Sequence, residues 1–565
     1  MKTKRLWMVV SIFSLAVFSC DCGGGGGGPG SNPGGSNPPG GNNPPGGNNP
    51  ACSALGGSRI GETKQFWALD DKDRFHSVNA VLRAEGNRST FWVQKELNVA
   101  ASVLASFVSE YENKIRPAVL GAFSVQGPIK DPESNEVVAQ NSLEWADYLG
   151  DCDGKTAILI VDMGDGADSG VITMGYFFPP DLYAKGDPRN LDSQYSNEAD
   201  MFYINVHALP YPTIFKTLAH EAQHLINFVN SALLRRFHDE DLGMSDWHQM
   251  DIWINEGLSS AAEYVYSGQH NEARFDRFND GLGAIISGNN FFVWGERPDA
   301  ILDEYATVYL FFQWLRLQAG GDNKIYQDIS KSPQFDHQSV VNAIQGKGNY
   351  LGESNLQWGT LLRDWLIANL MTKEGGTASP SNRHSYMADP LLSKIQVRLL
   401  PSGYDVMELY PGEGVYTFTN AAGRTYGNIA NHGPNIRYAA MDYLNGGPIN
   451  PNGTSFKNGF LLTYNINTVN DVEGDFTYVY EWLNALEKLR ERGHISSDVY
   501  AIVPSPPNNA GKNMKSFVST PRKAQPSEPQ AISLWDMIRL REFRGEIEAP
   551  AFNQKKNRSR KHTEH

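Results

Sequence analysis

Cysteine and positive charge are both scarce in this chain. Its 565 residues include four cysteines, Cys20, Cys22, Cys52 and Cys152, and no two of them form a CxxC pair, so a cysteine-bound metal is not expected. The formal net charge is -14, which argues against a general nucleic-acid binder, because phosphate contacts need a basic surface. The one basic run, residues 555–562, indicates a solvated terminus rather than a binding site.

The first residues of the chain have the pattern of an export signal. Residues 6–18 are apolar, follow a basic start and are too short for a comfortable membrane span. The run ends in Ser19-Cys20, which resembles the lipobox of bacterial lipoproteins. The resemblance implies a signal peptide over residues 1–19, a lipid on Cys20, and an exported protein anchored to a membrane at the cell surface or in the periplasm. A plain secretory signal and a released protein are the alternatives.

A low-complexity segment follows the proposed lipid attachment site. Residues 23–50 consist of glycine, proline, asparagine and serine, so residues 20–51 are predicted to form a flexible tether. With Cys20 lipidated, three cysteines remain in what we expect to be an oxidising compartment. Cys52 and Cys152 flank the start of the folded region and are the expected disulfide pair, although sequence alone does not establish the connectivity.

The hydrophobic pattern of the remaining chain predicts an α+β fold. The expected strands cover residues 77–82, 90–93, 157–161, 171–178, 415–419, 438–443 and 460–465. The expected helices cover residues 99–111, 212–237, 251–266, 304–317 and 480–492. The predicted organisation is a β-rich N-terminal region (52–130), a domain of mixed sheet and helices (131–388), a mostly β C-terminal domain (389–550) and a basic disordered tail (551–565).

The helix expected after Pro212 carries an HExxH pattern. On a helix, His220 and His224 lie one turn apart on the same face, so both imidazoles can reach a single tetrahedral metal ion. Glu221 lies on the flank of that face, where it can meet a water beside the metal and act as the catalytic base. A third protein ligand is needed, and the metzincin pattern is excluded because Asn227 and Asn230 stand where it needs glycine and histidine.

A second motif stands downstream. The segment 253–264, WINEGLSSAAEY, resembles the Asn-Glu-Gly motif of gluzincins, and this resemblance implies that Glu256 is the third zinc ligand. Glu263 lies two helical turns further on the same face, where it can accept the spare ring N–H of a ligand histidine. Ordinary solvated acids are the alternative for Glu256 and Glu263, while His238 and His248 are rival ligands in an expected loop.

Together the two motifs resemble one family over roughly residues 60–385. The segments AHEAQHLINF (219–228) and WINEGLSSAAEY, with Gly175-Tyr176-Phe177 and Ser196-Asn197-Glu198, are similar to the hyicolysin-type metallopeptidases, peptidase family M30. The resemblance implies a gluzincin-like fold, one zinc ion per chain and an endopeptidase acting on extracellular proteins or peptides. We expect a monomer, and the net charge argues against a nucleic-acid partner. Glu221 would accept the proton of the attacking water and pass it to the leaving amine.

Two features of the expected active site remain open at this point. Tyr305 is the candidate donor to the tetrahedral oxyanion, although aromatic residues on an apolar helix, such as Tyr305 and Tyr309, are more often core residues. The substrate is expected to pair with an edge strand, either residues 201–206 or residues 171–178.

Two further possibilities are an inactive binding protein and a calcium-binding loop. An inactive adhesin or binding module on a metallopeptidase-like fold suits the tether and the C-terminal domain equally well, but the presence of ligands, base and supporting acid together disfavours it. The acidic loop with Asp162, Asp165 and Asp168 lacks the spacing of an EF-hand and is predicted to be a solvated turn.

Overall fold

The structure is a computed structural model that describes residues 8–10, most of residues 58–371, and shorter segments from 382 to 468. Gaps before residue 371 fall at 71–73, 131–134, 166–170, 187–190, 234–249, 280–290 and 293–300. The chain divides into two compact units, Met1–His248 and Gln249–His565. The signal peptide except for residues 8–10, the tether, the expected helix 480–492 and the basic tail lie outside the described residues.

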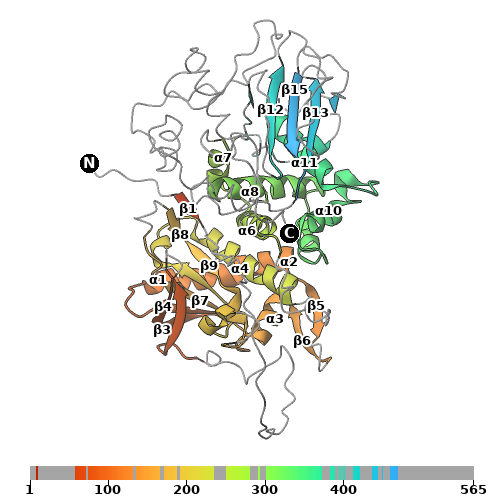
Figure 1. Ribbon diagram of the computed structural model, residues 1–565. Helices are drawn as coiled ribbons and strands as arrows, with labels where there is room; N and C mark the ends of the chain where they lie inside the picture. Colours follow the sequence, from red (N-terminus) through yellow and green to blue (C-terminus); the bar gives the residue numbers. More distant parts are fainter. Residues whose placement is uncertain are drawn as a thin grey trace, which may run out of the picture. The chain divides into compact units, whose positions relative to one another are not determined.

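The described part of the first unit is organised around a six-stranded sheet, whose strands run through orange and yellow in Figure 1. Their order is β2 (Thr63–Leu69), β3 (Phe75–Glu85), β4 (Ser89–Gln94), β7 (Thr156–Val161), β10 (Met201–Asn205) and β9 (Gly175–Phe177). Strands β4, β7 and β10 run parallel, whereas the β2–β3, β3–β4 and β10–β9 pairs are antiparallel. The predicted boundary near residue 130 therefore divides strands that share one sheet.

The central strands are apolar because both faces of the sheet are covered. Strands β7 and β10 are buried at every position, which is typical of parallel strands packed on both sides. One core cluster includes Phe66, Trp92, Leu159 and Tyr203. Helix α1 (Ala101–Glu110) contacts β3 and β4, and helix α4 (Ile214–Phe228) contacts β9 and β10. The sheet thus positions the helix that carries the HExxH motif.

The order of the strands decides between the two expected substrate strands. β10 has a neighbour on each side, so the expectation that residues 201–206 form an edge strand is wrong. β9, within residues 171–178, is the last strand of the sheet beside β10 and remains the candidate. The sequence could not separate them because a buried parallel strand and a buried edge strand have similar apolar patterns.

Smaller elements complete the described part of the first unit. They are the π-helical turn η1 (Tyr111–Ile115), α2 (Arg116–Phe123), the pair β5 (Gln126–Lys130) and β6 (Val137–Asn141), α3 (Ser142–Leu149), the short helices η2 (Pro179–Leu182), η3 (Leu191–Tyr195) and η4 (Val206–Ala208), and the parallel pair β1 (Met8–Val10) and β8 (Val171–Thr173). Asn141 caps α3 by accepting from the backbone N–H groups of Leu143 and Glu144 at 3.2 and 3.1 Å.

The described part of the second unit begins with helices. They are α6 (Ile252–Ser267), α7 (Glu272–Asn279), α8 (Ile301–Gln318), α9 (Lys324–Ser330), α10 (His337–Ile344), η7 (Gly348–Tyr350), α11 (Trp358–Met371) and η9 (Asn382–His384). Helix α6 packs along α8, and α7 also contacts α8. Helix α8 is therefore the central element of this group.

A five-stranded sheet follows in the described segments after residue 398. Its order is β11 (Leu399–Leu400), β12 (Gly414–Thr419), β15 (Gly459–Asn465), β13 (Ile436–Asp442) and β14 (Pro448–Ile449), drawn in cyan and blue in Figure 1. β15 packs against α11, and the Tyr416 hydroxyl donates to the Leu366 carbonyl at 2.7 Å. The five-stranded sheet therefore packs against helix α11 within the second unit.

Most expected elements correspond to observed ones. The strands at 77–82, 90–93, 157–161, 415–419, 438–443 and 460–465 lie within β3, β4, β7, β12, β13 and β15 to within one residue, and the expected strand 171–178 is divided into β8 and β9. The expected helices at 99–111, 251–266 and 304–317 correspond to α1, α6 and α8. The structure is thus a mixture of helices and sheets, as predicted. Among the described residues, no helix is both long and apolar enough to cross a membrane.

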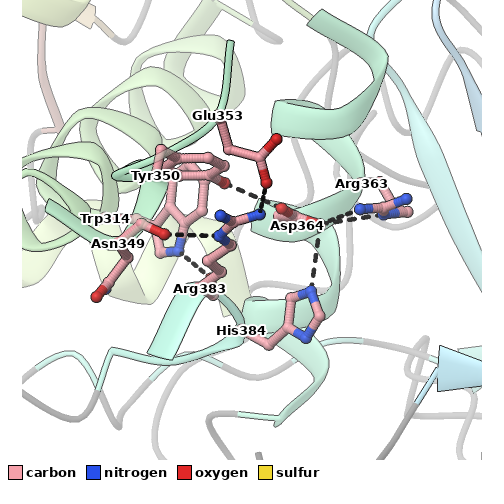
Figure 2. A network of polar contacts seen from close by, with 8 residues as sticks. All are labelled: Trp314, Asn349, Tyr350, Glu353, Arg363, Asp364, Arg383 and His384. Atoms are coloured by element: carbon pink, nitrogen blue, oxygen red, sulfur yellow. Dashed lines mark hydrogen bonds and ion pairs between the residues drawn. The ribbon is translucent and has the colours of Figure 1, made fainter. Parts of the chain in front are cut away.

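A buried carboxylate organises the polar contacts beside α11, as Figure 2 shows. Asp364 accepts hydrogen bonds from Tyr350 at 3.1 Å, from Arg363 at 2.7 Å and from His384 at 3.2 Å. Burial alone would raise the pKa of Asp364, but the His384 hydrogen bond and the Arg363 charge outweigh it and hold the pKa below 3.8. Asp364 thus ties α11 to η7 and η9.

Replacing this carboxylate should destabilise the second unit. Asp364→Asn removes a charged acceptor that three buried or half-buried donors share, so we expect the free energy of unfolding to fall by about 1–3 kcal/mol, measured by urea unfolding. Because the folded pKa is lowered, the difference should be full above about pH 4 and vanish in stronger acid. Asp328→Asn, which breaks a more exposed pair with Lys347, is the control and should cost under about 1 kcal/mol. Equal effects of the two variants would contradict this role.

Candidate functional site

Helix α4 carries the HExxH motif in a buried setting. The helix has one strongly apolar face, with Leu218, Ala222 and Leu225 fully buried against the rest of the unit. His220, Glu221 and His224 are also at most 1% exposed, although their side chains are polar. The helix continues into a π-helical turn, η5 (Val229–Leu233), so the expected helix 212–237 is confirmed up to residue 233, where the described segment ends.

The two histidines are placed as ligands of one ion would be. Their ring centroids lie 4.7 Å apart with the planes at 73°, as expected for residues one turn apart on a helix. Their ring nitrogens lie within 4.8 Å of each other. Two imidazoles and carboxylates are the donor types that zinc prefers in hydrolytic sites, so this half of the site fits the metal that the sequence predicts.

Two contacts fix the position of α4 within the first unit. A side chain at Gly175 would lie 2.7 Å from the Tyr203 carbonyl oxygen and 3.2 Å from Thr217, so glycine allows β9 to pack directly between β10 and α4. Past the end of α4, Asn230 donates to the Phe123 carbonyl at 2.9 Å and accepts from the Ser142 hydroxyl at 2.5 Å. These bonds attach the turn after the helix to the ends of α2 and α3.

Helix α6 positions Glu256 within the second unit. Trp253, one turn before Glu256, is buried in a cluster of aromatic rings and lies 5.2 Å from Phe291 and 6.1 Å from Phe312. Such ring packing fixes the rotation of the helix. Glu256 itself is 1% exposed, so the alternative of a solvated surface acid is wrong for this residue.

The close packing of α6 against α8 explains why glycine follows Glu256. A side chain at Gly257 would lie 2.3 Å from the Phe312 ring, because α6 approaches α8 closely at this point. The Asn-Glu-Gly motif therefore combines a buried carboxylate with a residue that allows two helices to touch. The sequence motif alone predicts only the carboxylate.

Glu263 is also buried, so a solvated acid is again the wrong alternative. Its carboxylate accepts from Asn271 at 2.9 Å and from Arg274 at 3.3 Å. The guanidinium of Arg274 lies over the Tyr305 ring, 4.9 Å from its centroid. Tyr305 is 1% exposed, and this chain of contacts links α6, α7 and α8 within the second unit.

A buried Tyr–His–Asp chain beside these residues was missed by sequence reasoning. The His270 ring contacts the Tyr309 hydroxyl through Nδ1 at 2.7 Å and the Asp389 carboxylate through Nε2 at 2.8 Å. The Tyr309 hydroxyl also accepts from the backbone N–H of Asn271 at 3.2 Å. Tyr309 therefore has a structural role in connecting α8 to the start of α7, and no local motif marks it.

Several predicted residues cannot be placed. Cys20 and Cys52, and the rival ligands His238 and His248, lie outside the described residues. Cys152 is half-buried, with its sulfur 3.8 Å from the Tyr148 carbonyl oxygen. The disulfide between Cys52 and Cys152 and the lipid on Cys20 remain predictions.

Comparison with known proteins supports a hyicolysin-type metallopeptidase, the class that the two motifs predict. The chain is similar to the neutral metalloprotease ShpI of Staphylococcus hyicus, with 28% identity over 302 residues. The matched region covers 52% of this chain and 60% of that protein, so the chain spans less than two thirds of the relative's length. No protein-family model matches the chain.

The close approach at Gly257 gives a prediction for the second unit. Gly257→Ala places a methyl group against the Phe312 ring, so α6 or the ring must shift, which costs about 1–3 kcal/mol of stability. We expect a lower melting temperature, measured by circular dichroism. Gly121→Ala in α2 is the control: this helical glycine has no atom within 4 Å of the added methyl group, so the substitution should not lower the melting temperature. A Gly257→Ala melting temperature equal to that of the wild type would show that the helices do not touch there.

Proposed function

We propose that the chain is a zinc-dependent endopeptidase that hydrolyses protein or peptide bonds outside the cytoplasm. The observation that carries the proposal is the buried pair His220 and His224 on α4, with Glu221 beside them on the same helix. The similarity to a neutral metalloprotease supports the reaction class.

The ligand set is proposed to be His220, His224 and Glu256. Two imidazoles and one carboxylate leave the fourth position of a tetrahedral zinc ion open for water or substrate, which distinguishes a catalytic site from a structural one. Each of the three side chains is at most 1% exposed within the described residues, and histidine and glutamate are donors that zinc accepts. When bound, zinc would polarise the peptide carbonyl and lower the pKa of the attacking water.

The protein's own groups move the proton. Glu221 is fully buried, so its carboxylate is held in a setting where electrostatic interactions are stronger than in water. We assign to it the removal of the proton from the attacking water and the transfer of that proton to the leaving amine.

Glu263 is proposed as a positioning residue that orients a ligand histidine, and Tyr305 as the donor to the oxyanion. The edge strand β9 would pair with the extended substrate.

Export and the lipid on Cys20 are part of the proposal and are supported by the sequence pattern of residues 1–51. Action on extracellular substrates as a monomer completes the proposal. An inactive adhesin on the same fold is the alternative, and no described contact favours it. The two proposals differ in whether the folded, zinc-loaded chain cleaves protein.

The role of Glu221 is tested by casein hydrolysis. Glu221→Gln keeps the shape of the side chain but cannot accept a proton, so we expect kcat/KM to fall by about 10²–10⁴-fold at unchanged zinc content. Chelation should stop the wild-type enzyme, and added zinc should restore it. A wild-type protein that is folded and zinc-loaded but cleaves neither casein nor a mixed peptide library would favour the adhesin.

The role of Glu256 is tested by metal content rather than by activity. Glu256→Gln removes one anionic ligand, so zinc retained after dialysis, measured by atomic absorption, should fall well below one ion per chain. The matched control is Glu272→Gln, at an exposed position in the same unit, which should retain zinc as the wild type does. Full zinc occupancy of the Glu256 variant would direct attention to His238 or His248 as the third ligand.

A further inference from the structure

Three carboxylates meet at one point of the first unit, away from the HExxH helix. Asp147 lies in the last turn of α3, and Asp151 and Asp153 follow in the loop that leads to β7. One oxygen from each side chain lies within 4.8 Å of the others. Three negative charges this close repel each other, and an acidic cluster of this kind also occurs without a ligand, so a second, independent observation is needed.

The loop that carries these acids is held in one conformation. The Asp147 carboxylate accepts from the Gly154 N–H at 2.7 Å, and the Asp153 carboxylate accepts from the Lys155 N–H at 2.8 Å. Gly154 and Cys152 both have left-handed backbones, at φ 78° and 56°. Each carboxylate oxygen has two lone pairs, so backbone bonds of this kind leave acceptor capacity for an ion.

The independent observation is a fourth acid beneath the cluster. Asp200 is 1% exposed, and neither of its carboxylate oxygens makes a hydrogen bond of normal geometry, although the Thr156 hydroxyl lies close enough to favour the charged form. One oxygen of Asp151, also 1% exposed, is in the same condition. Buried carboxylates in folded proteins nearly always have a donor or a bound cation, so these two acids point to a cation at this place.

Electrostatics places Asp200 against the cluster. Its pKa is raised first by burial and then by the charges of Asp151, Asp147 and Asp153, in that order, so these carboxylates lie near enough to repel one another. Burial and the neighbouring acids likewise raise the pKa of Asp151 to about 8, and burial raises that of Asp153 to about 6.

Nearby positive side chains compensate little of this charge. Arg88 acts on Asp147, and Lys155 and Lys64 act on Asp153, but burial raises the pKa of both acids in spite of them. Lys155 and Lys64 also pair with Glu85 and Glu62. Four acids in this space therefore need bound protons or a cation.

We propose that Asp147, Asp151 and Asp153 bind a divalent cation of the calcium type, with Asp200 as the buried counter-charge beneath it. Calcium takes six to eight oxygen ligands in flexible geometry, so carboxylates, loop carbonyls and water can complete its shell. The absence of histidine and cysteine ligands from this acidic group distinguishes it from a zinc site.

The cation would join segments that support the histidine helix. It would connect the end of α3 to Asp200, which directly precedes β10. Both α3 and β10 contact α4. A side chain at Gly150 would lie 2.7 Å from the Asp200 backbone nitrogen, so the two segments already touch at this point. The ion therefore stabilises the unit that carries His220 and His224 without taking part in hydrolysis.

Calcium binding to the full chain is the first test. Protein passed over a chelating resin and resupplied with zinc is titrated with calcium while its melting temperature is followed. We expect the melting temperature to rise by several degrees once calcium exceeds its Kd about 100-fold. Terbium, which binds calcium sites, should show luminescence that calcium removes. No change in melting temperature up to about 10 mM calcium, and no terbium signal, would overturn the proposal.

A variant of the cluster should change stability in opposite directions with and without calcium, which a purely structural role of the acids would not produce. Without calcium, Asp151→Asn relieves the repulsion and should raise the melting temperature above that of the wild type, and with calcium the order should reverse. Asp162→Asn, in the other acidic loop, is the matched control and should keep the wild-type response to calcium. An Asp151 variant that still gains stability from calcium would rule out this site even if the wild type binds the ion.

The pH dependence follows from competition between protons and the ion. Because the pKa values of Asp151 and Asp153 are raised to about 8 and about 6, protons occupy the cluster as the pH falls from 8 to 6, and the apparent Kd for calcium should increase over this range. A Kd that does not change between pH 8 and pH 6 would contradict carboxylate ligation by this group.

Discussion

The first unit depends on the burial of helix α4. Almost every side chain of this helix is removed from solvent, including His220, Glu221, Gln223 and His224. Burying polar groups costs free energy unless they find partners, so a helix of this kind is stable only where the surrounding elements hold it firmly. Strands β9 and β10 and helices α2 and α3 supply that support. The sheet, in turn, is apolar on both faces because it must pack against such helices.

The second unit also buries polar side chains, and it stabilises them through other contacts. Two of its buried carboxylates are paired with positively charged or hydrogen-bond-donating side chains. Glu263 meets Asn271 and Arg274, and Asp364 meets Arg363 and His384. Trp253 and the phenylalanine rings around it hold α6 against α8. A hydrolytic site needs its ligands in fixed rotamers, and such packing would hold the proposed ligand Glu256 in one rotamer.

The proposed zinc and calcium sites differ in their ligands and in their roles. Imidazole nitrogens suit zinc, whose open position serves catalysis, whereas carboxylates suit a hard cation that binds many oxygens. In the first unit, the two proposed histidine ligands lie on α4, and the acidic cluster lies beside α3 and β10, which contact α4. Stability and catalysis would therefore be coupled through one helix, although they use different ions.

The sequence by itself determined many of the helices and strands and the chemistry of the proposed zinc ligands. HExxH and Asn-Glu-Gly are local patterns, and helical spacing is enough to place His220 and His224 on one face. The burial of Glu256 and Glu263, in contrast, depends on which helices pack on α6, and no spacing rule contains that information. For the same reason the sequence left open whether they were solvated.

Only the tertiary structure decided the features that join distant segments. It showed that residues 201–206 form an interior strand, because strand order depends on long-range pairing. It brought Asp200 beneath Asp147, Asp151 and Asp153, which stand about fifty residues earlier in the chain. The sequence drew attention instead to the loop with Asp162 and Asp165, because no local pattern shows that the fold brings Asp200 to residues 147–153. Local patterns reveal chemistry carried by one element, whereas a site built from separated segments exists only once the chain is folded.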